Sequence, residues 1–210
     1  PPPLAVIERV TADTVAPVGE GRFTVVASRS GGEHSALVSP DTATCDECLE
    51  ELWDPAGRRH RYPFTNCTNC GPRFTIVRGV PYDRPLTTMA PFEMCDRCAA
   101  EYHDPADRRF HAQPVCCPAC GPQLVLTDGS RRPLAGQDPL PRAVARRRDR
   151  LGGAVEGLGG YHLAVRADDE VAVARLRARK HREEKPFAVM VADLEAARAL
   201  CTVGPAEAAL

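Results

Sequence analysis

The chain has 210 residues, a formal net charge of −1 at pH 7 and ten cysteines. The near-neutral charge gives no basis for a global attraction to nucleic acid or to an acidic membrane. No apolar stretch approaches the roughly 20 residues of a membrane-spanning helix, and no secretory signal is present, so we expect a cytoplasmic protein without membrane contact. Twenty prolines, 16 glycines and few aromatic residues predict short units rather than one large core.

The first 40 residues have the composition of a connector. The chain starts at Pro1 and not at a methionine, and we therefore expect a fragment of a longer protein. The β-rich runs at residues 4–10 and 22–28 are flanked by proline and glycine, which predicts a pair of strands. The polar residues Ser39, Asp41 and Thr44 then offer caps for a short helix.

Eight of the ten cysteines repeat with a period of fifty residues. Each repeat has the spacing Cys-x2-Cys-x18-Cys-x2-Cys. The sequence between the cysteine pairs of each repeat is similar too, with "DPAGRR" at 54–59 and "DPADRR" at 104–109. Two such pairs supply the four sulfur ligands that a structural zinc ion prefers. The predicted zinc ligands are Cys45, Cys48, Cys67, Cys70, Cys95, Cys98, Cys117 and Cys120.

We expect two structural zinc ions, since four cysteines leave no open position for catalysis. Gly71 and Gly121 follow the second cysteine pairs, and there a positive φ would turn backbone N–H groups toward the sulfurs. Several arginines lie near enough in sequence to offset the thiolate charge: Arg58, Arg59, Arg73, Arg108 and Arg109. A unit this short buries too little apolar surface to fold alone, so metal binding would supply the folding free energy.

Two questions stay open at this point. The cysteine pairs could share ions sequentially, or in a crossed arrangement of outer with outer and inner with inner pairs. Disulfides are the alternative to zinc, although four identical pairs at fixed gaps are unusual for them. Cys116 breaks the repeat and is interpreted as a spare thiol, Cys201 as a buried helix residue, and His103 and His111 as structural residues.

After the cysteine repeats, the pattern predicts a brief strand at 123–126, a linker that ends at 141 and a basic helix at 142–151. That helix is most simply a solvated basic face, with phosphate or nucleic-acid binding as the alternative. The "GGAVEGLGGYHLAV" segment then predicts two short strands around a glycine-rich turn.

The last sixty residues predict alternating helices and strands. Asp168 or Asp169 would cap a helix through about Arg182, which Pro186 would stop. The apolar run at 187–191 is typical of a central strand. A final helix would start at Asp193 and end at Gly204, giving an α/β layer overall.

The only lysines, Lys180 and Lys185, fall together in "RKHREEKP". With Arg177, Arg179 and Arg182 they form a basic cluster that suits a polyphosphate. A charged helix end is the simpler alternative.

The stretches "CDECLEELWDPAGRRHRYPFTNCTNCGPRFTI", "CDRCAAEYHDPADRRFHAQP", "GLGGYHLA" and "LRARKHREEKPFAVM" together resemble the HypF family of carbamoyltransferases, which mature nickel–iron hydrogenases. The resemblance implies a small, multi-unit α+β fold: two tandem four-cysteine zinc-finger-like units followed by a partial α/β YrdC-like domain. It implies the following parts: a connector after a missing acylphosphatase domain at 1–40, finger units at 41–75 and 91–125, a linker at 126–141, and a partial nucleotide-binding YrdC-like domain at 142–210.

The resemblance also implies a reaction. The family uses carbamoyl phosphate and ATP to form a carbamoyl adenylate, and then carbamoylates the C-terminal cysteine of the partner HypE for cyanide ligand synthesis. The family's nucleotide-binding signature falls on Lys180, Arg182, Lys185 and Pro186. The strand "GGAVEG" departs from the family, because Glu156 stands where a lysine is usual. No general base is identified, and the fragment alone is expected to be inactive.

The alternative is a zinc-ribbon module that binds double-stranded RNA or another protein without catalysis. Such a module would need exposed aromatic side chains beside basic residues. Tyr62, Phe64 and Phe74 are the candidates, although packing on the finger is their simpler role.

Overall fold

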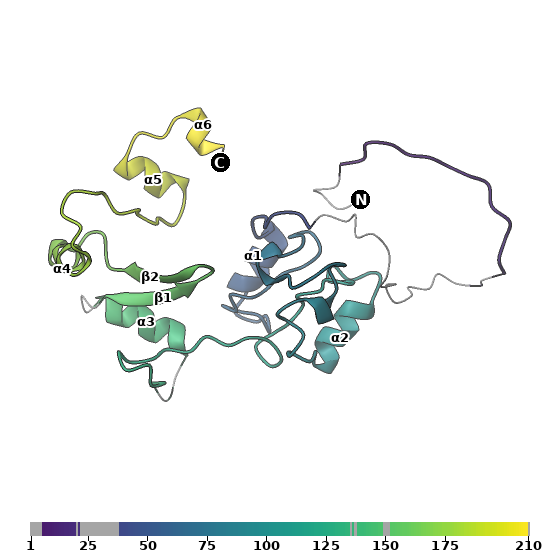
Figure 1. The fold of residues 1–210 in the computed structure, drawn as a ribbon, viewed down its shortest axis with the longest axis horizontal. Coiled ribbons are helices and arrows are strands. Elements are labelled where there is room, and N and C mark those ends of the chain that lie inside the picture. Colours follow the sequence, from purple (N-terminus) through teal and green to yellow (C-terminus); the bar gives the residue numbers. More distant parts are fainter. Residues whose placement is uncertain are drawn as a thin grey trace. The chain divides into compact units, whose positions relative to one another are not determined.

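The structure is a computed structural model that describes residues 6–19, 21, 38–134, 136, 138–148 and 152–209. It divides into two units, Pro1–Gln123 and Leu124–Leu210, each of which is described by itself (Figure 1). The strand predicted at 22–28 lies outside the described residues, and residues 6–10 of the other predicted strand are exposed and form no strand. None of the helices in the described ranges has the length and apolarity needed to cross a bilayer.

The first unit contains two short helices in equivalent positions of the repeat. Helix α1 (Asp46–Trp53) begins directly after Cys45, and α2 (Asp96–His103) begins directly after Cys95. The 3-10 turns η1 (Phe74–Ile76) and η2 (Arg84–Leu86) lie between the two helices along the chain. The short helix predicted for the first repeat is therefore confirmed, and the second repeat has an equivalent helix.

The predicted caps of α1 were wrong. Neither Ser39 nor Thr44 precedes the helix directly, and Asp41 instead accepts a hydrogen bond from the Phe74 backbone N–H at 2.6 Å. Cys45 is the N-cap, and its carbonyl accepts from the Leu49 N–H at 3.0 Å. A cysteine at this place leaves the sulfur free to face the other cysteines rather than to cap the helix.

The interior of the first unit is small and largely not aliphatic. Besides cysteines, its buried side chains include Arg59, Arg109 and Tyr62, and among the described residues of this unit Val115 is the only fully buried branched aliphatic side chain. Such an interior buries too little apolar surface to stabilise a fold of this size. The cohesion of the unit must come mainly from its polar and sulfur-containing groups.

The described residues of the second unit form an antiparallel hairpin and four helices. Strands β1 (Gly153–Gly157) and β2 (Gly160–Ala164) pair from Gly153 with Ala164 to Gly157 with Gly160, as predicted. The helices are α3 (Pro139–Arg148), α4 (Glu170–Lys180), α5 (Leu194–Leu200) and α6 (Pro205–Ala208). Together with the finger unit this gives the small α+β chain that was predicted.

The starts of α4 and α5 were predicted better than their ends. Asp169 caps α4 and Asp193 caps α5, each by accepting a hydrogen bond from the N–H three residues on. Helix α4 ends at Lys180, because His181 takes a left-handed conformation with φ of 48°, and the predicted stop at Pro186 was wrong. Helix α5 ends at Leu200, and Gly204 is the N-cap of α6 rather than the end of α5.

Two strands predicted for the region after the last cysteine pair do not form among the described residues. Residues 123–126 and 187–191 form no strand, and Met190 is 97% exposed. A strand needs a partner for its backbone groups, and none of the described residues supplies one.

Cys201, predicted as a buried helix residue, is the exposed C-cap of α5. The basic helix begins at Pro139 and not at 142, so the predicted linker is shorter than expected.

Candidate metal centres

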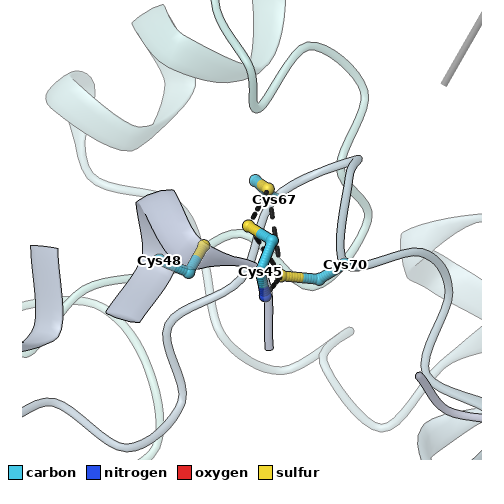
Figure 2. Close-up of side chains that lie close together, drawn as sticks. All are labelled: Cys45, Cys48, Cys67 and Cys70. Carbon is cyan, nitrogen blue, oxygen red and sulfur yellow. Dashed lines mark hydrogen bonds between the residues drawn. The ribbon is translucent and has the colours of Figure 1, made fainter. Parts of the chain in front are cut away.

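The first four-sulfur cluster joins the two ends of the first repeat. Cys45 and Cys48 lie at the start of α1, and Cys67 and Cys70 lie in the loop that returns to it. The Sγ–Sγ distances are 3.5 Å for Cys45–Cys67, 3.4 Å for Cys45–Cys70 and 3.9 Å for Cys67–Cys70. All four sulfurs lie within 4.8 Å of one another and point toward a common centre (Figure 2).

The second cluster has the same construction fifty residues later. Its Sγ–Sγ distances are 3.8 Å for Cys95–Cys117, 3.7 Å for Cys117–Cys120 and 3.6 Å for Cys98–Cys120. Again all four sulfurs lie within 4.8 Å of one another. Of the two pairings that the spacing leaves open, the structure therefore has the sequential one.

Both clusters fit a zinc ion. Four sulfurs at a Zn–S distance of about 2.3 Å form a tetrahedron with edges of about 3.8 Å, close to the distances in both clusters. A disulfide would need an S–S distance of about 2.05 Å, and all ten cysteines are free. The disulfide alternative is therefore wrong for this structure. Four sulfurs leave no coordination position open, which indicates a structural role for the metal.

Arginines reach the sulfurs of the opposite finger, not those of their own. Arg58 Nη1 lies 3.3 Å and Arg59 Nη2 3.5 Å from the Sγ of Cys98. In return, Arg108 Nη1 lies 2.8 Å from the Sγ of Cys48. A guanidinium beside a thiolate forms a charge-assisted hydrogen bond and offsets the charge of the four-thiolate site. Of the five arginines expected to offset the sulfur charge, Arg58, Arg59 and Arg108 contact a sulfur, in each case that of the opposite finger. The side chains of Arg73 and Arg109 donate to backbone carbonyls instead.

Two carboxylates lie among the same arginines. Glu51 accepts from Arg59 at 3.1 Å and from Arg108 at 2.6 Å, and it also pairs with Arg109. Glu101 pairs with Arg58 and Arg59, each at 2.6 Å. Burial raises the pKa of Glu101, but the hydrogen bonds from Arg59 and Arg58 outweigh burial and hold this pKa at about 2. The carboxylates are ionised at neutral pH, and they join the two fingers through the arginines.

Sequence reasoning missed these carboxylates, although a signal was present. Glu51 and Glu101 are fifty residues apart, and each follows the second cysteine of its helix by three positions. Residues three apart lie on one face of a helix, so each carboxylate lies on the side that also presents a zinc ligand.

The glycines after the second cysteine pairs have a different purpose from the one predicted. Gly71 has a φ of 71°, but its N–H donates to the Thr68 carbonyl at 3.0 Å rather than to a sulfur. The N–H of Gly121 donates to the Cys117 carbonyl at 2.8 Å. A Cβ at position 121 would lie 2.6 Å from the Cβ of Cys116, so this site needs glycine for space.

Cys116, His103 and His111 lie outside both sulfur clusters. Cys116 is buried outside both clusters, where the Tyr62 hydroxyl donates to its sulfur at 3.5 Å. His103 and His111 pack around Tyr102, with their ring centroids 6.5 Å apart, and belong to neither sulfur cluster. Tyr62 is 5% exposed and Phe64 packs edge-on against it, which leaves Tyr62 unable to stack on an RNA base.

The predicted nucleotide-binding residues lie on and just after the end of α4. Lys180 is the last residue of the helix, and Lys185 is exposed in the following loop. Arg182 is partly engaged, since its guanidinium lies 5.3 Å from the centroid of the Phe187 ring and donates to the Pro186 carbonyl at 3.2 Å.

Arg177 holds this loop. Its Nη1 donates to the carbonyls of Arg182, Glu183 and Lys185 at 3.2, 3.2 and 3.0 Å. Three carbonyl oxygens converging on one guanidinium fix the backbone between the two lysines. The sequence predicts Arg177 as a member of the basic cluster but does not indicate that it holds the loop.

Comparison with known proteins matches both parts of the chain. A family model described as "HypF finger" matches residues 44–77 and again residues 94–127, and a model of the Sua5/YciO/YrdC family, described as "Telomere recombination", matches residues 150–210. The whole chain is 53% identical to the carbamoyltransferase HypF2 of Cupriavidus necator and 51% identical to the carbamoyltransferase HypF of Rhizobium leguminosarum, and covers 26% of each. The chain thus spans about a quarter of the length of these curated relatives.

Two solved structures agree with the computed fold. A crystal structure of full-length HypF in a phosphate- and nucleotide-bound form is 50% identical, with a TM-score of 0.74 over 81% of this chain and 22% of that one. The crystal structure of T. kodakarensis HypF is 47% identical, with a TM-score of 0.77 over 82% of this chain and 23% of that one.

Proposed function

The chain belongs to the HypF family, with two finger units followed by the beginning of a YrdC-like domain, and we propose from this membership that it forms part of an enzyme that transfers a carbamoyl group. The observation that carries the proposal is the 53% identity to a carbamoyltransferase over the whole chain, with the two sulfur clusters intact. The reaction would start from carbamoyl phosphate and ATP, pass through a carbamoyl adenylate and end on the C-terminal cysteine of HypE. That step leads to the cyanide ligands of nickel–iron hydrogenases.

The finger unit would be the scaffold of this enzyme. The eight cysteines of the two clusters would each supply one thiolate, and a bound zinc ion contributes folding free energy rather than chemistry at a four-sulfur site. The arginines and carboxylates between the clusters hold the two fingers in one arrangement. We infer a cytoplasmic location, because four-cysteine zinc sites require reduced cysteines, which a reducing compartment maintains.

The basic segment would bind the triphosphate of ATP. Lys180 and Lys185 supply point charges on both sides of the loop that Arg177 holds, and Arg182 adds a planar fork. Cations at this place would stabilise the charge that develops on the leaving pyrophosphate. The support for this role is the family membership together with the arrangement of the loop.

A chimeric enzyme tests the function. This chain replaces the matching segment of the Cupriavidus necator relative, and carbamoyl-phosphate-dependent exchange of pyrophosphate into ATP is measured together with carbamoylation of HypE. We expect the chimera to be active and the double change Lys180→Ala and Lys185→Ala to reduce exchange by about 10²–10³-fold, as the loss of charge-stabilising groups does elsewhere.

The control is Arg146→Ala, which removes an exposed positive charge from α3 in the same unit and should leave exchange unchanged. The purified 210-residue chain is expected to carbamoylate no HypE by itself. An active chimera in which the lysine changes have no effect would refute the proposed ATP site, and an inactive, folded chimera would refute the proposed function.

A further inference from the structure

Each finger supplies groups that the metal site of the other finger needs. The arginines near Cys98 come from the 54–61 loop of the first repeat, which lies between Cys48 and Cys67. The arginine near Cys48 comes from the equivalent loop of the second repeat. An ion bound in one cluster would join the two ends of a loop, and the arginines of this loop donate to a sulfur of the other cluster.

The arginine contacts between the fingers extend to the backbone beside the proposed zinc ligands. Arg59 Nε donates to the carbonyl of Cys116 at 2.8 Å, and this carbonyl directly precedes the ligand Cys117. Arg109 Nε donates to the carbonyl of Asn66 at 3.0 Å, which directly precedes Cys67. These arginines are 0% and 4% exposed, so each fixes the approach of the chain to the opposite cluster in a buried position.

The carboxylates complete the coupling. Glu51, on α1, pairs with Arg108 and Arg109 of the second repeat as well as with Arg59 of its own. Without an ordered loop in one finger, the carboxylate and thiolate of the other finger lose the arginines that this loop supplies. Leaving buried charges unpaired is costly, so disorder in one finger must weaken the other.

We propose that the two metal sites bind their ions with positive cooperativity, and that Arg58, Arg59, Arg108 and Arg109 carry the coupling between them. This inference rests on the proposal that both clusters hold zinc. Coupling free energies between sites correspond to affinity changes of about 5–150-fold, and the coupling must be equal in both directions. Hydrogen bonds to metal ligands have effects of a similar size, about 10–100-fold in affinity.

Native mass spectrometry of the reduced chain, during titration of the metal-free protein with buffered zinc, tests the proposal. Two independent sites, equal or unequal, give at least about half of the molecules with one ion when half of the total sites are filled. For two sites of equal intrinsic affinity, coupling of about 5–150-fold lowers the one-ion fraction at that point from about half to between about a third and less than a tenth. A one-ion fraction of half or more would overturn the cooperativity, while a chain that binds no zinc would overturn the metal proposal as well.

A pair of variants tests whether the arginines between the fingers carry the coupling. The double change Arg58→Gln and Arg108→Gln removes the two partly exposed arginines that contact the opposite sulfurs, and it should raise the one-ion fraction toward about half. The control Arg73→Gln removes an arginine that donates to the Thr42 and Cys70 carbonyls of its own finger, and the one-ion fraction should stay below half. An unchanged one-ion fraction in the double variant would overturn the assignment of the coupling to these arginines.

Discussion

Replacing Cys67 by serine is expected to release the zinc ion of the first cluster, to weaken zinc binding at the second cluster and to unfold the finger unit. Cys67 is 1% exposed, and its sulfur lies 3.5 and 3.9 Å from the sulfurs of Cys45 and Cys70. Structural zinc contributes about 10–16 kcal/mol in finger peptides. This exceeds or equals the whole stability of a typical domain, about 5–15 kcal/mol. With so little apolar surface in the interior, the unit has no source of stabilising free energy of comparable size.

The matched control for this change is Cys116→Ser. Cys116 is adjacent to the ligand Cys117 and is buried to the same degree, but it belongs to neither cluster. The control should keep both ions and a cooperative thermal transition. Zinc content and circular dichroism, measured on the same samples, distinguish the two variants. If Cys67→Ser kept two ions and the transition of the unchanged protein, the first cluster would not be a metal site.

The change Arg59→Gln is expected to destabilise the zinc-loaded finger unit by about 3–5 kcal/mol. Arg59 is 0% exposed and pairs with Glu51 at 3.1 Å and with Glu101 at 2.6 Å, while its Nε holds the Cys116 carbonyl. The substitution leaves two half-buried carboxylates with fewer partners. Hydrogen bonds from Arg59 and Arg58 hold the pKa of Glu101 at about 2 although burial raises it, so this pKa should rise when Arg59 is replaced.

Urea unfolding at neutral pH in the presence of zinc measures this effect. The control Arg97→Gln removes an exposed arginine from α2 of the same unit, and it should change the free energy of unfolding by less than about 0.5 kcal/mol. A loss below about 1 kcal/mol for Arg59→Gln would contradict a joining role for the arginine and carboxylate cluster between the fingers.

The two four-sulfur clusters were predictable because the spacing of their cysteines is a local feature of the sequence. Two residues between cysteines and a repeat period of fifty predict four-sulfur sites without any knowledge of the fold. The pairing of the knuckles was not predictable in this way, because sequential and crossed arrangements use the same spacing. The contacts of Arg58 and Arg108 were anticipated only as charge near sulfur, since the crossing between fingers depends on tertiary structure.

Secondary structure was predictable where a local signal decides it. Asp169 and Asp193 start helices because an aspartate side chain caps the first turn, and the hairpin follows its glycine-rich turn. The strand expected at 187–191 failed because apolar composition alone does not provide a partner strand. Helix α4 ended early because His181 adopts a left-handed conformation, which composition did not indicate.

The most direct test of the central claim is the metal content of the purified chain together with X-ray absorption at the zinc edge. We expect two zinc ions per chain, one for each four-cysteine cluster. Each ion should have four sulfur neighbours at about 2.3 Å, and both should be lost together with the fold on chelation. A natively folded chain without zinc, or one in which these eight cysteines form disulfides, would contradict it.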